Sequence, residues 1–194
     1  MTFQSARGAT PLTEEDLRDL IPNLTTQKQL DEFEAENILR GQLWARKSRV
    51  LQTELLSVSG ICVLHKRMFD QTWRWAGDLR LRALTTIGVA PHLIQPDLGN
   101  LFNDVRFWID NKIYSEDEIA IRFSHRLVQI HPFRNGNGRH SRIAADLLAV
   151  QLGKSEFAWG REIPENERRD RYIEALKAAD GSMDVSELTD FARN

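Results

Sequence analysis

Hydrophobic residues recur with helical spacing along most of this chain. From Ser48 to Phe69 the apolar side chains fall three or four residues apart, which places them on one face of an α-helix. The same period returns after Pro96, and Ser115-Glu116-Asp117-Glu118 has the pattern of a capping box at the start of another helix. The pattern therefore predicts a mostly α fold, a bundle of seven or eight helices.

One segment interrupts the helical period. Between Trp73 and Leu93 the sequence contains glycines, β-branched residues and the alternating run Leu79-Arg80-Leu81-Arg82. Alternation of apolar and polar residues is typical of a strand with one buried face. We therefore predict a small β-hairpin flap in this segment.

The chain has 194 residues, which is the length of one domain. A polar stretch from Thr26 to Lys47 reads as an exposed amphipathic helix, so we expect residues 1–47 to form an N-terminal helical extension and residues 48–194 to form the core. No apolar run approaches the roughly 20 residues that cross a bilayer. Residues 1–13 lack the apolar core and positive flank of a secretory signal. We expect a cytoplasmic protein with no membrane partner.

Positive charge is concentrated in one short segment. The net charge is −2, which disfavours nucleic acid as a partner because no basic field covers the protein. Between residues 122 and 145, however, there is no acidic residue, and three of the five histidines lie there. The segment also holds five arginines: Arg122, Arg126, Arg134, Arg139 and Arg142.

Within this segment, residues 131–142 read His-Pro-Phe-Arg-Asn-Gly-Asn-Gly-Arg-His-Ser-Arg, a glycine-bearing loop between two predicted helices. Such a loop directs several N–H groups and the helix dipole at one place, where a phosphate fits. Arg139 and Arg142 fall in the first turn of the second helix, where positive charge is unfavourable by about 0.3–1 kcal/mol each. A bound polyphosphate would supply the missing negative charge. The alternative is an ordinary turn with solvated arginines.

The same twelve residues resemble the signature of the Fic family, His-Pro-Phe-x-(Asp/Glu)-Gly-Asn-Gly-Arg-x-x-Arg. They match it at every specified position except the acidic one. Trp75-Ala76-Gly77 is similar to a Trp-Ala-Gly segment that precedes the substrate-binding flap of that family. The resemblance covers about residues 50–179, and within the family the chain resembles a mobile-element-associated subgroup called mobile mystery protein B.

The resemblance implies a protein adenylyltransferase, which transfers AMP from ATP to a hydroxyl side chain of a target protein. It implies His131 as the general base and Phe133 as the residue that anchors the loop in the core. Phosphate binding would fall to the loop and the helix after it: Gly136, Asn137, Gly138, Arg139 and Arg142. Arg139 would take the β-phosphate side and Arg142 the γ-phosphate.

The resemblance also implies how the target is held. Residues 85–94 correspond to the family's flap, which aligns a target segment by strand-like backbone pairing. The flap residues would be Thr86, Ile87, Gly88 and Val89. The partner is then a protein that offers a Ser, Thr or Tyr hydroxyl, and the chain itself is a candidate target.

Asn135 is the departure from the signature. Active family members usually carry Asp or Glu there to hold the Mg²⁺ that bridges the phosphates, and Asn is a much weaker Mg²⁺ ligand. Two interpretations stay open at this point: AMP transfer with Mg²⁺ held largely by ATP, or a catalytically weakened nucleotide-binding module with a regulatory or toxin-like role. A metal-dependent nuclease and a helix bundle without a ligand are minor alternatives.

Self-inhibition is a further expectation. Many Fic proteins carry a helix with (Ser/Thr)-x-x-x-Glu-(Gly/Asn), whose glutamate pairs with the last arginine of the signature. Glu36-Asn37 supplies this ending here, which makes Glu36 the candidate inhibitory residue. The alternative is that Glu36 belongs to a solvated acidic face. Farther along the chain, Arg168, Arg169 and Arg171 are typical of an ordinary charged helix surface.

Overall fold

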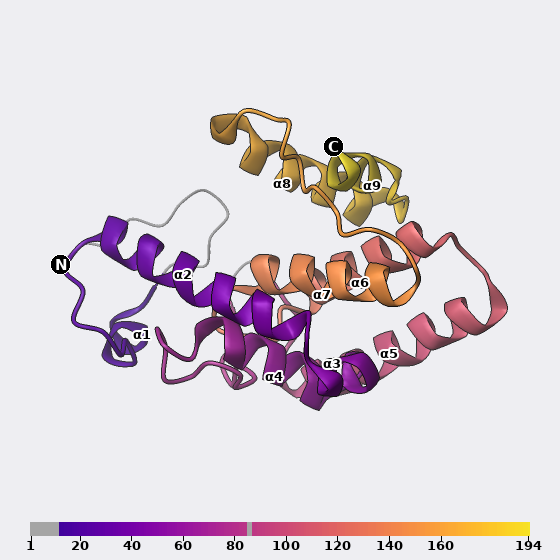
Figure 1. Cartoon of the computed structure of the whole chain (residues 1–194). Coiled ribbons are helices and arrows are strands. Elements are labelled where there is room, and N and C mark those ends of the chain that lie inside the picture. Colours follow the sequence, from indigo (N-terminus) through magenta and orange to yellow (C-terminus); the bar gives the residue numbers. More distant parts are fainter. Residues whose placement is uncertain (1–11, 85–86) are drawn as a thin grey trace.

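The computed structural model describes residues 12–84 and 87–194. This part of the chain folds into nine α-helices and one short 3₁₀ helix, so the predicted mostly α fold is confirmed (Figure 1). In chain order the elements are α1 (Glu14–Arg18), α2 (Gln27–Ala45), α3 (Arg49–Glu54), α4 (Val58–Phe69), η1 (Pro91–Leu93), α5 (Ile94–Asn111), α6 (Glu116–Ile130), α7 (Asn137–Gln151), α8 (Glu165–Ser182) and α9 (Ser186–Arg193).

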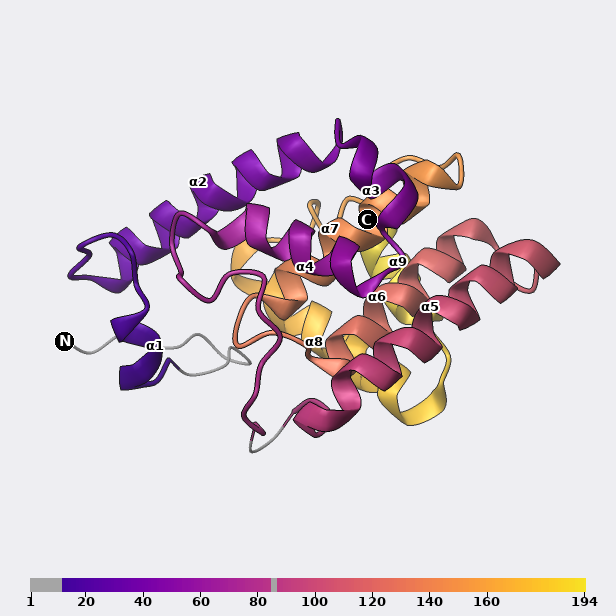
Figure 2. The same ribbon diagram turned by 90° about the horizontal axis from the view of Figure 1, so that it is seen from below.

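Helix α7 lies at the centre of the bundle. It packs along α6 and against α4, and α2 covers α4 on the other side (Figure 2). Helices α8 and α9 pack together, and α9 contacts α6. Many of the buried side chains of α7 are small residues or leucine, among them the fully buried Ala144 and Ala145. Small side chains allow neighbouring helices to approach closely, so the start of α7 is fixed against several elements at once.

Helix α2 turns a polar face to the core. Its buried positions are Leu30, Glu34, Asn37, Gly41 and Ala45, spaced three or four residues apart as on one helix face. A Cβ atom at Gly41 would lie 2.6 Å from the backbone oxygen of Arg67, so glycine is needed for the close approach to α4. The side-chain oxygen of Asn37 accepts a hydrogen bond from the backbone N–H of Gln71 at 2.9 Å.

The expected β-hairpin flap is not present in the described residues. The segment pairs with the loop after α6 instead of with itself. Leu79 forms an isolated bridge with Phe133, and the backbone N–H of Arg80 donates to Pro132 O at 2.9 Å. The N–H of Val89 donates to Ile130 O at 3.3 Å. Both sides of the predicted flap therefore bond to residues 130–133, at the end of α6 and just after it. The alternating residues pair with that segment and not with each other in a hairpin.

None of the helices in residues 12–84 and 87–194 is long and apolar enough to cross a membrane.

Candidate active site

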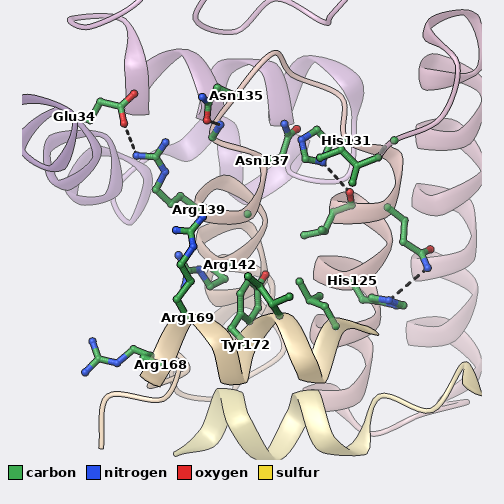
Figure 3. Close-up of a pocket in the computed structure, with 18 of the residues that line it drawn as sticks. Glu34, His125, His131, Asn135, Asn137, Arg139, Arg142, Arg168, Arg169 and Tyr172 are labelled. Carbon is green, nitrogen blue, oxygen red and sulfur yellow. Dashed lines mark hydrogen bonds and ion pairs between the residues drawn. The ribbon is translucent and has the colours of Figure 1, made fainter. Parts of the chain in front are cut away.

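A cleft of about 1070 Å³ lies where α2, the loop after α6, the start of α7 and one face of α8 meet (Figure 3). Among its walls are His131, Gly138 and Arg142 from the twelve-residue segment. The structure therefore brings together the histidine and the arginines that the sequence singled out.

His131 ends α6 in a left-handed conformation, with φ 54° and ψ 60°. Its Nδ1 lies 3.2 Å from the backbone oxygen of Val128, and a carbonyl can only accept a hydrogen bond. The proton of the neutral ring is therefore on Nδ1, and Nε2 is the unprotonated nitrogen. Burial lowers the pKa of His131 to about 4, with a contribution from the positive charge of Arg80. The imidazole is thus neutral at pH 7.

The loop after His131 is held by its own side chains. Phe133 is fully buried and its ring stacks on that of His65, with centroids 3.8 Å apart. The side chain of Asn137 bonds both ways to the backbone of Phe133: its oxygen accepts from the N–H at 2.9 Å and its amide donates to the carbonyl at 2.8 Å. Asn137 thereby fixes the loop, and its contribution to an anion site is left to its backbone N–H at the start of α7.

Two glycines of the loop have different reasons to be glycine. Gly136 has φ +78°, and a Cβ there would lie 2.5 Å from the ring of Phe69. A Cβ at Gly138 would meet only the ring of Tyr172, at 4.0 Å. The protein itself therefore has room for a side chain at Gly138. Glycine at this position keeps the floor of the cleft open beside the N-terminus of α7.

Four arginines line the cleft from two helices, and one of them, Arg168 of α8, bonds to backbone carbonyls. Arg139 and Arg142 come from α7, and Arg169 comes from α8 (Figure 3). Burial and the nearby charges of Arg139 and Arg142 lower the pKa of Arg169. The guanidinium of Arg142 lies 5.0 Å from the centre of the Tyr172 ring. Such a concentration of positive charge at a helix N-terminus is suited to a ligand that carries several negative charges.

A sequence model of the Fic/DOC family matches residues 55–149, which include α4 to most of α7. The chain belongs to the Fic/DOC family. It is 25% identical over 133 residues to a protein named protein adenylyltransferase Fic from Aedes aegypti, covering 67% of this chain and 26% of that protein. It is 27% identical over 124 residues to a protein adenylyltransferase from Bartonella henselae, covering 52% of this chain and 22% of that protein.

A solved structure gives the same fold. The N-terminal Fic domain of a cell filamentation protein from Bartonella quintana, solved with bound ADP, superposes with a TM-score of 0.70 at 18% identity, over 96% of this chain and 91% of that one. At this identity the likeness establishes the Fic fold alone. The chain spans about a quarter of the length of the two curated adenylyltransferases.

The loop between α6 and α7, residues 131–136, is called the Fic loop here. Its side chains do not fit a magnesium ion held by the protein. Asn135 offers an amide oxygen in place of a carboxylate, and that oxygen already accepts the N–H of Gly136 at 2.6 Å. Among the described residues no three His, Cys, Asp or Glu side chains are grouped as metal ligands. The donor set favours a weak site at most.

The glutamate of α2 that reaches the Fic loop is Glu34, and the structure does not place Glu36 there. Glu34 is 6% exposed and its Oε2 lies 2.6 Å from Nη1 of Arg139. Glu36 is exposed and pairs with Arg40 on the outer surface of the same helix. The two positions are two residues apart, which corresponds to about 200° around a helix. The contact is also made to Arg139 and not to Arg142.

The flap segment contributes two described residues to the cleft, Ile87 and Gly88. Val89 bonds to the end of α6 through its backbone N–H. Thr86 lies outside the described residues. A Cβ at Gly88 would lie 2.9 Å from Cβ of His131, so this segment passes directly beside the histidine.

The residues that sequence reasoning missed come from α8. Arg168 and Arg169 both line the cleft, although an ordinary surface was expected there. Arg168 is committed to backbone carbonyls, with 2.8 Å to Gly160 and 3.0 Å to Ile163. Asp180 also lines the cleft and bonds to His125 at 2.8 Å. The sequence signal for Arg169 was its spacing of three residues from Tyr172, which places both on one face.

Proposed function

We propose that this Fic protein transfers AMP from ATP to a hydroxyl side chain of a target protein. The observation that carries the proposal is the shared cleft, in which the neutral imidazole of His131 lies beside the arginines at the N-terminus of α7. One cleft can then hold a triphosphate and accept a proton next to it. The names of the two curated relatives and the ADP in the solved Fic domain support the same activity.

The cleft accommodates the two ends of a nucleotide differently. Arg139, Arg142 and Arg169 surround the end at α7 and suit phosphate oxygens, because guanidinium forks match them. Farther along α8, Ile173 and Leu176 line the wall and give an apolar surface for a base. A volume near 1070 Å³ exceeds what a small anion needs. We therefore infer a nucleoside triphosphate as the substrate, in particular ATP.

The reaction uses His131 as its base. The target hydroxyl oxygen attacks the α-phosphorus of ATP and its proton passes to Nε2 of His131. A bond forms between the hydroxyl oxygen and the α-phosphorus. The bond from the α-phosphorus to the α,β-bridging oxygen breaks, and pyrophosphate leaves with the negative charge. The arginines and the N–H groups at the start of α7 stabilise that charge. The hydrogen bond to Val128 O keeps the proton of the neutral ring on Nδ1. Nε2 is therefore unprotonated and able to accept the hydroxyl proton.

The extension of residues 1–47 regulates the core of residues 48–194. Glu34 presents a carboxylate to Arg139, and a β-phosphate would need the same guanidinium. Glu34 is also held by Trp73, whose indole N–H donates to Oε1 at 2.6 Å. The Glu34 carboxylate therefore competes with ATP for Arg139, and release of Glu34 permits nucleotide binding.

The target is held by its backbone. Residues Ile87 to Val89 pass beside His131, and a target peptide can bond to the backbone of Ile87 and Gly88 at the edge of the cleft. Backbone pairing selects an extended Ser, Thr or Tyr segment with little side-chain preference. A loop of the chain itself can meet this requirement, so self-modification belongs to the proposal.

Asn135 favours a second candidate, a module that binds nucleotide and transfers little. The amide at this position offers no carboxylate to hold a metal ion at the phosphates, and such an ion would stabilise the charge that develops during transfer. One experiment separates the two. Purified protein carrying Glu34→Gln is incubated with α-labelled ATP and a cell lysate, beside the double variant Glu34→Gln/His131→Ala.

Label on protein that is lost with His131→Ala supports AMP transfer. ATP binding by calorimetry without any label supports the nucleotide-binding module and contradicts transfer. Absence of both ATP binding and label contradicts both candidates. Glu36→Gln is the matched control, because it makes the same charge change on the outer face of the same helix.

A further inference from the structure

Arg80 is a buried cation between the flap segment and the Fic loop. Its side chain is 2% exposed, although arginine is rarely buried without partners. The Nε atom donates to the backbone oxygen of His131 at 2.7 Å, and Nη2 lies 3.4 Å from that of Ile130. On the other side, Nη1 donates to Arg82 O at 2.9 Å and Nη2 donates to Val89 O.

These four acceptors belong to two functional segments. Ile130 and His131 form the C-terminal end of α6, and Arg82 and Val89 both belong to the segment between α4 and η1. A guanidinium has its donors in a rigid plane, so acceptors bound to one guanidinium are fixed relative to each other. The carbonyls at a helix C-terminus also carry partial negative charge, which favours a cation there.

Gly88 shows how closely the three parts fit. It has φ +84°, and a Cβ there would lie 2.7 Å from Nη2 of Arg80 and 2.9 Å from Cβ of His131. The backbone of Gly88 therefore packs against the guanidinium and the histidine together. Arg80 itself is absent from the described walls of the cleft, which include Ile87, Gly88 and His131. Arg80 therefore contacts His131 and the Gly88 segment, which line the cleft, but it does not line the described cleft itself.

We propose that Arg80 is a positioning residue that sets the register between the target-binding segment Ile87–Val89 and the base His131. The proposal rests on the proposed AMP transfer. A target hydroxyl is aligned by the flap, its proton acceptor is His131, and the distance between them is set through one shared guanidinium. Lysine cannot replace this function, because its single ammonium cannot serve acceptors on both sides in a fixed plane.

The test uses Arg80→Lys in the full chain that carries Glu34→Gln, with Arg82→Lys as the control. Arg82 is exposed and pairs with Glu15, so its side chain has no part in the link. We expect Arg80→Lys to leave the Kd for ATP unchanged and to slow label transfer from α-labelled ATP on the order of 10- to 100-fold, the usual result of a small misplacement of reacting groups. Arg82→Lys leaves both unchanged.

A second readout does not need the reaction. The His131 Cε1–H and Gly88 N–H resonances, followed by NMR in the same proteins, shift in Arg80→Lys and stay in place in Arg82→Lys. If the parent protein transfers no label, the proposed function fails and these resonances alone decide the role of Arg80. Where Arg80→Lys does not fold, Gly88→Ala takes its place, because a methyl group there separates the guanidinium from His131.

Two results would overturn the proposal. One is unaltered transfer in Arg80→Lys with both resonances unmoved. The other is a loss of ATP affinity as large as the loss of transfer, since a merely structural role weakens both alike.

Discussion

Glu34 of α2 and Arg139 of α7 form an ion pair in which Oε2 and Nη1 lie 2.6 Å apart. The carboxylate is almost fully buried, whereas the guanidinium is about one third exposed and lies 5.1 Å from the centre of the Phe69 ring. The pair joins the N-terminal extension to the first turn of the helix that follows the Fic loop. Under the proposed function, this position makes Glu34 a competitor of a phosphate at Arg139.

Glu34→Gln is expected to raise ATP affinity by about tenfold, because a neutral amide competes less for Arg139 than a carboxylate does. The amide oxygen can still accept the Trp73 indole N–H, so the helix stays in place. Isothermal titration calorimetry measures the change. Glu36→Gln is expected to bind ATP as the parent does, and equal affinities of all three proteins would contradict competition by Glu34.

Arg169→Ala is expected to weaken ATP binding by about tenfold and AMP binding much less, because the lost cation faces the phosphate end of the cleft. Arg171→Ala removes the same charge from the same helix at a position that does not line the described cleft, and it is expected to change neither affinity. Titrations of ATP and AMP into the three proteins check this. Equal losses for ATP and AMP would place Arg169 away from the terminal phosphates.

Asn135→Asp is expected to increase AMP transfer by about tenfold in the presence of Mg²⁺, because a carboxylate replaces the amide beside the phosphates. Label transfer is measured with Mg²⁺ and again after chelation with EDTA. The gain disappears on chelation if the new carboxylate acts through the metal. A gain that persists in EDTA would contradict this explanation of the Asn135 substitution.

Stability is expected to fall as the pH drops from 7 to 5. Burial lowers the pKa of His65 well below its usual value, and it lowers the pKa values of His131 and His140 to about 4. Below pH 6.5 the unfolded chain therefore takes up protons that the folded chain refuses, at a cost of about 2 kcal/mol each for His131 and His140 by pH 5. Urea unfolding at the two pH values measures the loss.

Asp146 has the opposite effect and supplies the control. Burial raises its pKa to about 6, so the folded chain binds this proton first and gains about 1 kcal/mol between pH 7 and 5. Asp146→Asn removes that gain, and the variant is expected to lose more stability on acidification than the parent does. An equal loss in Asp146→Asn would show that this carboxyl gains no proton on folding between pH 7 and 5, and a smaller loss would show that folding lowers its pKa.

Local signals predicted the helices well. Ser115 caps α6 as its sequence indicates, and Gly136, in the predicted glycine-bearing loop, is the residue that precedes α7. These features depend on neighbouring residues alone, because a cap bonds to an N–H two or three positions away. The fold class and the Fic loop could therefore be predicted from the sequence.

The parts that could not be predicted depend on distant segments. Leu39 and Leu43 are exposed on α2 while Glu34 is buried, so hydrophobicity pointed to the wrong face, and the Glu36-Asn37 ending singled out a glutamate that is exposed. The flap residues bond to the loop after α6, which no local alternation reveals. Arg169 carries the same charge whether it faces solvent or a cleft. In each case the deciding partner lies far away in the chain.

The inner face of α2 has a consequence for how the extension can come away. Glu34, Asn37 and Gly41 hold α2 in place through polar contacts and a close backbone approach, in addition to its apolar contacts. When α2 lifts, water can satisfy the carboxylate and the amide, and the apolar side chains that lose burial include Leu30, Ile38 and Trp44. Under the proposed regulation, the extension therefore acts as a removable cover that a competing peptide or a rise in nucleotide concentration dislodges.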